Sequence, residues 1–167
     1  SDSWYWYRFE ADGVASRTGR LRTAPSPGAT VDSMRFAFSS CQQLNPSWFV
    51  AHRAAAAELD LDFFMHLGDY VYVSDTGTQT LDDYRDVYHR WRRDPLLREF
   101  HATVPMVAMW DDGEFYNGVD KYGPPARLAA GRQAWFENMP ILNDGADTTY
   151  RNVAWGSLAD IPMIDVR

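Results

Sequence analysis

The sequence contains one cysteine, Cys41, and no apolar run long enough to cross a bilayer. A single thiol allows no internal disulfide framework and leaves the redox compartment open. A spanning helix needs roughly 18 or more consecutive apolar residues, so none is predicted. No segment has the charged, apolar and small-residue regions of a secretory signal peptide, and there is no internal repeat or low-complexity tract.

Basic residues are also scarce: 16 Lys and Arg stand against 23 Asp and Glu, a net charge of −7. Without a basic stripe, we expect no nucleic-acid-binding module. An acidic protein can still act on phosphate esters when bound cations reverse the field of its site. The 167 residues, 46% of them apolar and 15% aromatic, suffice for one domain with a core.

Three apolar stretches predict strands of one sheet, and each ends in side chains that can ligate or react. Residues 34–40 lead to Cys41, residues 61–67 to Gly68 and Asp69, and residues 104–110 to two further acids. Open α/β sheets bind ligands at the carboxyl ends of their strands, where Gly68 allows a tight turn. The plainer alternative is that Asp69 only caps the next segment.

Helices are predicted between and after these strands. Asn45 with Pro46 is expected to begin one helix that runs to about residue 59, and Thr80 with Asp83 forms a capping box for a helix over 81–93. A short helix to His101 and a longer one over 125–138 follow. Three arginines near residue 93 fit either a solvated helix end or a phosphate clamp; they are Arg90, Arg92 and Arg93.

Hairpins are predicted at both ends of the chain. Residues 4–9 and 17–23 form the first, and residues 149–155 and 161–167 form the second. Two strands alone are marginally stable in water, so we expect residues 1–24 to be the remnant of an amino-terminal, Ig-like β-sandwich domain. Residues 25–33 are the predicted linker, and residues 34–167 the amino-terminal half of a catalytic domain.

The strand ends would bring several anionic groups to one edge of the sheet. Asp69, Asp111 and Asp112 would repel one another unless a cation lay between them. Carboxylates suit hard cations, whereas the thiolate of Cys41 and the phenolate of Tyr72 suit iron or zinc. Each of these two has an alternative role, because a lone cysteine is most often a buried structural thiol and a lone tyrosine packs.

Three motifs in this order resemble the PhoD-like family, the alkaline phosphatase D enzymes among the calcineurin-like metallophosphoesterases. They are Arg35-Phe-Ala-Phe-Ser-Ser-Cys-Gln42, Leu61-Asp-Phe-Phe-Met-His-Leu-Gly-Asp-Tyr-Val-Tyr72 and Met109-Trp-Asp-Asp-Gly-Glu114. The resemblance implies an α/β fold, namely the amino-terminal part of a metallophosphoesterase sheet sandwich with helices, preceded by the last hairpin of a β-sandwich. It also implies a missing carboxyl-terminal half.

The resemblance further implies hydrolysis of small-molecule phosphate monoesters or diesters by a metal-activated hydroxide. Its dinuclear centre would hold iron with calcium or another divalent metal. Cys41, Asp69 and Tyr72 would ligate iron, with Asp69 bridging to the second metal. Asp112 would ligate that metal and serve catalysis, and Asn117 is a further candidate. An extracytoplasmic or secreted location is likewise what the resemblance implies.

Two positions depart from the family pattern: Gly113 replaces the histidine expected to assist the phosphoryl group, and Val73 replaces an acid. The alternative hypothesis is therefore a degenerate relative with weak or no catalysis that retains the fold and partial metal or phosphate binding. A histidine introduced at position 113 is expected to restore turnover. A third hypothesis is an interaction module whose aromatic amino-terminal strand meets a partner.

Overall fold

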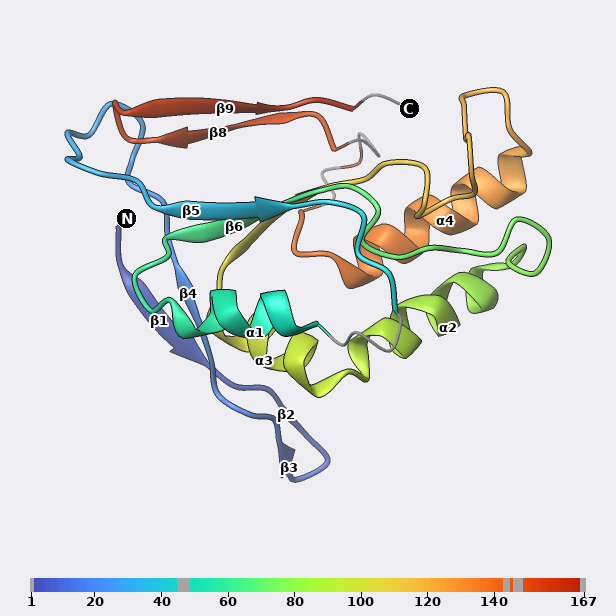
Figure 1. Cartoon of the computed structure of the whole chain (residues 1–167), viewed down its shortest axis with the longest axis horizontal. Helices are drawn as coiled ribbons and strands as arrows, with labels where there is room; N and C mark the ends of the chain where they lie inside the picture. The colour runs from blue at the N-terminus through green and yellow to red at the C-terminus, as the bar shows by residue number, and fades with distance from the viewer. Residues whose placement is uncertain (1, 45–48, 143–144, 146–148, 166–167) are drawn as a thin grey trace.

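Three parallel strands form the centre of the molecule, in the order β5-β6-β7. They are β5 (Phe36–Ser39), β6 (Phe63–Leu67) and β7 (Met106–Met109), all within the predicted stretches but shorter. The computed structural model describes residues 2–44, 49–142, 145 and 149–165. Its mixed α/β layers, with the sheet between helices and a β-hairpin, confirm the predicted fold class (Figure 1).

Helices α1 (Val50–Ala57) and α3 (Pro95–Thr103) cover one face of this sheet. The Phe64 ring of β6 makes an edge contact with Phe100, 4.8 Å between centroids, and lies 5.8 Å from the His52 ring. The predicted cap of α1 at Asn45 and Pro46 lies outside the described residues, and the helix begins after Phe49 without a side-chain cap.

Helices α2 (Leu81–Arg92) and α4 (Pro125–Asn138) pack against each other beyond the carboxyl ends of the strands (Figure 1). The capping box predicted at Thr80 and Asp83 is present. Asp94 caps α3 through the backbone N–H groups of its first turn. Within the described part of the chain, no helix has the length and apolar character that crossing a membrane requires.

The opposite face of the sheet carries the antiparallel hairpin of β8 (Arg151–Trp155) and β9 (Ala159–Met163). The Phe63 and Trp155 rings lie 5.2 Å apart between these two layers. The predicted boundaries of the last strand, 161–167, were wrong. A three-residue turn after Trp155 pairs that residue with Ala159, so the strand starts two residues earlier and ends at Met163.

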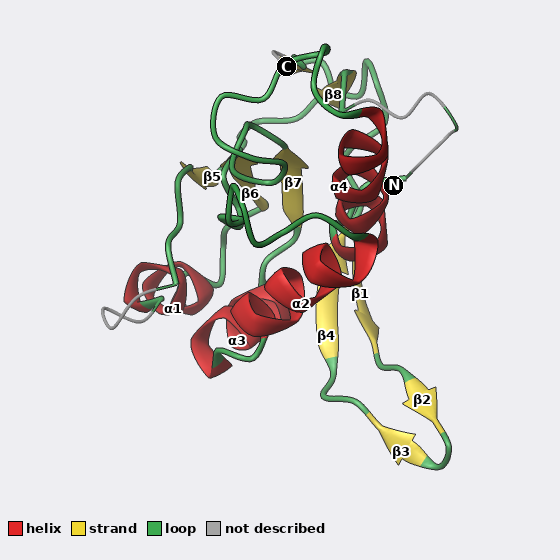
Figure 2. Cartoon of the chain, turned by 90° about the vertical axis from the view of Figure 1, so that its right-hand side faces the viewer, coloured by secondary structure: helices red, strands yellow, loops and turns green. Residues whose placement is uncertain are grey.

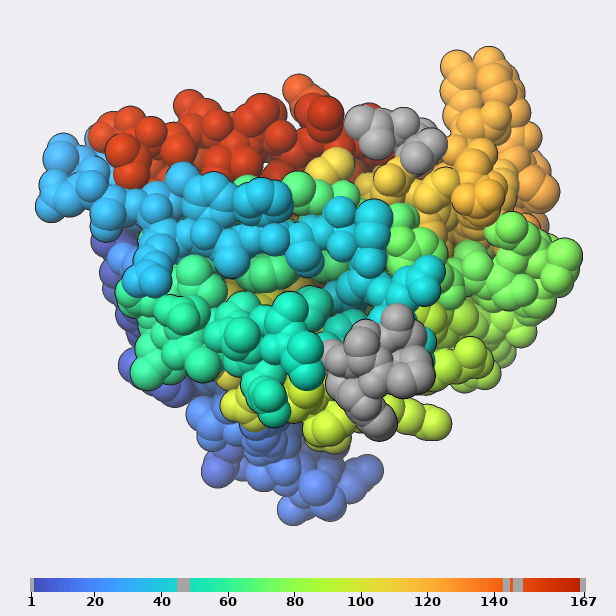
Figure 3. Space-filling model, in the orientation of Figure 1, coloured from blue at the N-terminus to red at the C-terminus, as the bar shows by residue number. Residues whose placement is uncertain are grey.

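Strand β5 lies open at the surface between β8–β9 and α1 (Figure 3). It forms one edge of the parallel sheet, and its side chains alternate between the two faces. Ala37 packs against the core, whereas Phe38 on the other face is 65% exposed. The face that carries β8–β9 is thus only partly covered.

The amino-terminal hairpin projects away from the rest of the molecule (Figure 2). Strands β1 (Trp4–Tyr7) and β4 (Gly19–Arg22) pair at its base, and β2 (Glu10–Ala11) and β3 (Val14–Ala15) pair at its tip. The tip turns through Asp12 and Gly13, both with positive φ, as a two-residue hairpin loop requires.

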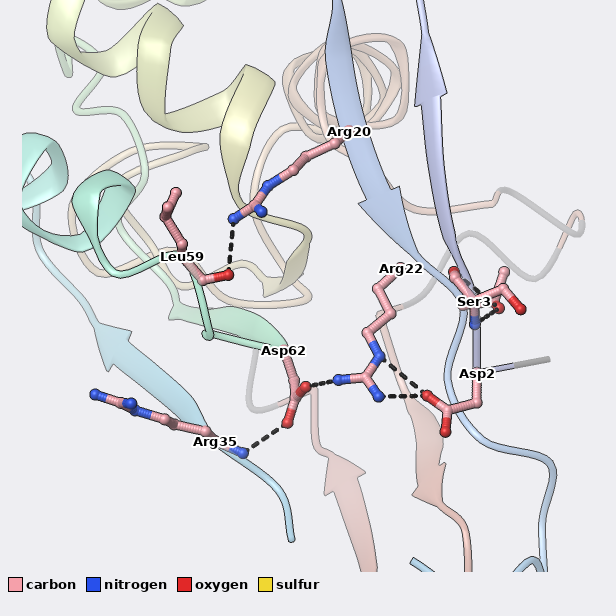
Figure 4. A network of polar contacts seen from close by, with 8 residues as sticks. Asp2, Ser3, Arg20, Arg22, Arg35, Leu59 and Asp62 are labelled. Carbon is pink, nitrogen blue, oxygen red and sulfur yellow. Dashed lines mark hydrogen bonds and ion pairs between the residues drawn. The ribbon is translucent and has the colours of Figure 1, made fainter.

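Arginines of β4 join this hairpin to the parallel sheet and its helices (Figure 4). The Arg22 guanidinium pairs with Asp62, which is buried, and also with Asp2. Asp62 accepts a second hydrogen bond from the backbone N–H of Arg35 at 2.7 Å. Arg20 donates to the carbonyl of Thr103 at 2.7 Å and to that of Leu59 at 3.3 Å.

Three histidines are enclosed by aromatic rings beneath the sheet. Burial lowers the pKa of His52 to about 4, and that of His66 and His101 to about 3. Neither ring nitrogen of His66 has a partner among the described residues, and Tyr70 Oη lies 2.5 Å from His101 Nε2. All three are therefore neutral in the folded state near neutral pH.

We expect Arg22→Ala to lower the free energy of unfolding by about 3–5 kcal/mol, because it leaves the Asp62 carboxylate buried without its cation. Arg8→Ala is the control, since its partner Glu10 is exposed and the pair contributes at most about 1 kcal/mol. Urea denaturation measures both. Equal losses in the two variants would contradict the role given to Arg22.

Acid should destabilise the fold before most carboxylates titrate. The unfolded histidines bind protons below about pH 6.5 and the folded ones do not, so stability is complete above that pH and falls toward pH 4. Between these pH values, each histidine lowers the free energy of unfolding by about 1.4 kcal/mol for every pH unit of acidification. His66→Phe should remove about one proton from the uptake on unfolding relative to the parent chain. Identical slopes for His66→Phe and the parent would refute this assignment.

Candidate metal centre

The turn after β6 carries Asp69 at the carboxyl edge of the sheet. Gly68 and Asp69 both have positive φ, +99° and +58°. A Cβ on Gly68 would lie 2.6 Å from the Cβ of Asp111, so only glycine permits this approach of the two strand ends. Asp69 itself adopts a conformation that non-glycine residues rarely accept, and such strain concentrates at functional sites.

The turn after β5 has the same irregularity. Cys41 has φ +59°, and its backbone N–H donates to the Gly68 carbonyl at 3.1 Å. The next residue, Gln42, donates to the Asp69 carbonyl at 3.0 Å, and its side-chain amide donates to Tyr70 O at 2.8 Å. The two turns therefore continue the pairing of their strands and bring Cys41 against Asp69.

The Asp69 carboxylate is the point at which the predicted ligands meet. Its Oδ2 accepts from Tyr72 Oη at 2.9 Å and lies 3.3 Å from Cys41 Sγ. Its Oδ1 accepts from the backbone N–H of Gly113 at 2.9 Å. Burial first, and then the hydrogen bonds to Cys41 and Asp69, raise the pKa of the Tyr72 phenol, so a phenolate there requires a nearby cation.

Two more acids complete the cluster from the end of β7. Carboxylate oxygens of Asp69, Asp111 and Asp112 all lie within 4.8 Å of one another. Three partly or fully buried carboxylates at this separation repel unless a cation compensates them, and oxygen, thiol and phenol donors together suit a metal ion. The residues present therefore fit a metal centre.

Glu114 holds the turns after β6 and β7 together from beneath. Its side chain is completely buried and accepts backbone N–H bonds from Asp69 at 3.2 Å, Tyr70 at 2.5 Å and Asp111 at 2.9 Å. Burial raises the pKa of Glu114 to about 8, while the bonds from Asp111 and Tyr70 act in the opposite direction. The strained turns thus have their N–H groups satisfied.

Asn117 is placed differently from the other predicted ligands. It is exposed, and its backbone N–H donates to Asp75 at 2.9 Å. Asp112 lies in the cluster and also accepts the Gly118 N–H at 2.6 Å, which fixes the adjoining loop. Among the candidates, the structure brings together Cys41, Asp69, Tyr72 and Asp112.

The sequence placed Asp111 among the acids that need a cation but did not name it as a ligand, and it gave Glu114 no role. Asp111 directly follows a predicted strand, so its position was a usable signal. Glu114 lies beyond the strand end, and nothing in the local pattern distinguishes it from a solvated acid. Only its hydrogen bonds with Tyr70 and Asp69, which lie 44 and 45 positions earlier in the chain, reveal its role.

Gly113 is enclosed rather than open. A Cβ there would lie 2.7 Å from Asp69 Oδ1 and 2.8 Å from the Val71 carbonyl oxygen. Any side chain at this position must displace the Asp69 carboxylate or the backbone. This crowding argues against the expectation that a histidine would simply restore function.

A sequence model described as PhoD-like phosphatase matches residues 36–167. The chain belongs to the PhoD-like phosphatase family. Alkaline phosphatase D of Bacillus subtilis (strain 168) is 37% identical over 193 residues, which cover 98% of this chain and 33% of the relative. A solved structure of PhoD matches with a TM-score of 0.84 and 34% identity over 96% of this chain and 36% of that one.

The PhoD-like chain thus spans about a third of the length of the relatives that it matches. The match includes all three strand ends and both turns described above. Family membership supports hydrolysis of phosphate esters in general. The acidic cluster is the group of side chains through which a PhoD-like chain of this sequence could bind a metal ion.

We expect Glu114→Gln to destabilise the fold by about 2–4 kcal/mol. An amide offers only one acceptor oxygen, so at least one buried N–H of the two turns then faces an NH₂ group, at about 1–3 kcal/mol for each unsatisfied group. Glu58→Gln, at an exposed pair with Arg35, should change stability by less than about 1 kcal/mol. Thermal and urea unfolding would show this difference, and a fully stable Glu114→Gln protein would contradict it.

Proposed function

We propose that this chain supplies part of the active site of a metal-dependent phosphoester hydrolase. The observation that supports it best is the gathering of Asp69, Asp111 and Asp112 with a thiol and a phenol at the carboxyl edge of the parallel sheet. Membership of the PhoD-like phosphatase family indicates the reaction class. The substrate in this proposal is a small phosphate monoester or diester.

In this proposal, Cys41, Asp69 and Tyr72 would hold iron, and Asp69 would bridge to calcium or another divalent metal held by Asp112. We add Asp111 to this second set because its carboxylate lies in the same cluster. Asn117 remains a proposed ligand, on a loop that Asp112 of the cluster holds through the Gly118 N–H. When bound, the metals would lower the pKa of a water molecule and offset phosphoryl charge.

The chain's own groups would orient this centre. Gly113 N–H and Tyr72 Oη donate to the two oxygens of Asp69, so they fix the direction of its lone pairs. Gln42 and Glu114 hold the two turns in place behind it. The side chains that would contact the metal are therefore positioned before it binds, which favours affinity.

The domain division and the cellular setting remain proposals. We propose that residues 1–24 are the end of an amino-terminal β-sandwich, that 25–33 link it, and that 34–167 belong to the catalytic domain. The hairpin form of the first segment supports this division. We also propose an extracytoplasmic setting, on the basis of family resemblance alone.

A degenerate relative is the second candidate, and Gly113 is the observation that favours it. This position supplies a backbone N–H to Asp69 but no side chain for proton transfer. Positioned proton donors contribute on the order of 10²–10⁴ in rate. A chain that binds metal and hydrolyses phosphoesters slowly would fit this alternative.

We expect Asp69→Asn and Cys41→Ser each to lower bound metal, measured by elemental analysis, and hydrolysis of an aryl phosphate. The loss of affinity should reach about 100-fold or more for Asp69→Asn, above the 10–100-fold typical of residues behind the ligands. Asp32→Asn, at an exposed position outside the cluster, is the control. Unchanged metal content in both cluster variants would refute the metal centre.

Gly113→His separates the two candidate functions. Because a Cβ at this position crowds Asp69 and Val71, we expect the variant to bind less metal, to melt at a lower temperature and to gain no turnover. The same preparations, assayed for metal and for aryl phosphate hydrolysis, provide the comparison. A variant with at least about tenfold higher turnover and unchanged metal content would instead support the degenerate relative.

A further inference from the structure

A cavity of about 450 Å³ opens beside the acidic cluster, between the loop after β6 and helix α2. Tyr72 contributes to its wall and donates a hydrogen bond to Asp69. On the helix side, the lining residues are spaced three and four apart, so they share one face of α2; they are Asp83, Asp86, Val87 and Arg90. A group bound at the cluster would therefore have its remainder directed toward α2.

A second cavity of about 210 Å³ continues along the same helix. It is lined by Asp86, His89, Arg90 and Arg93, and it shares Asp86 and Arg90 with the first. We call the two cavities together the α2 groove. From Asp83 to Arg90 the helix rises about 10 Å, so the groove accommodates an extended molecule.

The wall opposite α2 is held in place by its own hydrogen bonds. Arg127 donates to the carbonyls of Asp75 at 2.9 Å and Ser74 at 3.1 Å. The Thr78 hydroxyl accepts the Ser74 N–H at 3.2 Å, and the Ser74 hydroxyl accepts the Gly77 N–H at 3.0 Å. A wall fixed in this way requires little ordering when a ligand binds, which favours affinity.

The charge of the groove reverses along its length. Asp83 and Asp86 lie toward the amino-terminal end of α2, whereas Arg90 and Arg93 lie with His89 at its carboxyl-terminal, far end. Asp83 is committed to capping the helix, and hydrogen bonds from Thr80 and Gln79 lower its pKa. The far end therefore combines two guanidinium groups and an imidazole with one carboxylate.

The two arginines of the groove differ from their neighbours on α2. Arg85 pairs with Glu137, and Arg92 donates to the Asn138 carbonyl. Arg90 and Arg93 have no hydrogen bond or ion pair with the residues that the structure describes. In a chain of net charge −7, two cations without a described partner at the end of a groove form a binding site for an anion.

We propose that the α2 groove binds the alcohol portion of the substrate, and that Arg90 and Arg93 bind a second anionic group on it. The proposal rests on the proposed phosphoesterase function and names its substrate class. The substrate is a phosphoester whose alcohol carries a further phosphate or carboxylate. Hydroxyl groups between the two ends would meet Ser74, Thr78 and Asp86.

The test uses the full chain loaded with metal and two probes, an alkane phosphonate and the bisphosphonate with the same spacer. Calorimetry measures both affinities. The bisphosphonate should bind at least about tenfold more tightly, because charge-assisted hydrogen bonds contribute about 1.5–3 kcal/mol. Arg90→Ala/Arg93→Ala should abolish that preference, and Arg98→Ala, an exposed control on α3, should retain it.

The outcomes separate this inference from the proposed function. Equal affinities of the two probes for the parent chain, or a preference that persists in the double variant, would overturn the inference and leave the metal centre intact. Binding of neither probe to the metal-loaded chain would overturn both. A preference lost only on removal of the arginines supports the second anion site.

Discussion

The arrangement depends on one buried carboxylate. Glu114 accepts N–H groups from the turn after β6 and from the end of β7, so it joins two strand ends that the sheet alone would leave frayed. Asp69 and Asp111 are both bonded to it through their backbones, which fixes where their side chains emerge. The acidic cluster is thus built on the buried side chain of Glu114, which has no access to solvent. The three backbone N–H groups that donate to it make its burial tolerable.

Much of this organisation could be predicted from the sequence, because an apolar run that stops at Gly-Asp or Ser-Cys specifies both a strand and the turn at its end. The three parallel strands, the α2 cap and the meeting of Cys41 with Asp69 arise from such local signals. The start of β9 could not be predicted in this way. A three-residue turn after Trp155 and a longer turn would leave similar sequence patterns. The role of Glu114 depends on contacts between distant segments, which no local pattern encodes.

Two different electrostatic environments lie side by side at the site. At the strand ends, carboxylates, a thiol and a phenol are crowded around Asp69, and they favour a cation. Along α2 the sign changes toward Arg90 and Arg93. Gly113 leaves space for the Asp69 carboxylate, because a side chain at position 113 would collide with it. The backbone N–H of Gly113 also donates a hydrogen bond to that carboxylate. In the proposed function, family membership indicates the reaction class, and these local features would give its selectivity.

The amino-terminal hairpin has a consequence for synthesis on the ribosome. Arg22 can pair with Asp62 only after 40 more residues have been synthesised, and Arg20 can bond to Thr103 only after 83 more. At about 5–20 residues per second, the second contact becomes available on the order of ten seconds after the hairpin has been made. Until then the hairpin lacks one of its anchoring contacts, and two strands alone are only marginally stable in water. The hairpin is therefore translated well before the residues that anchor it, and it becomes stable only once they have been made.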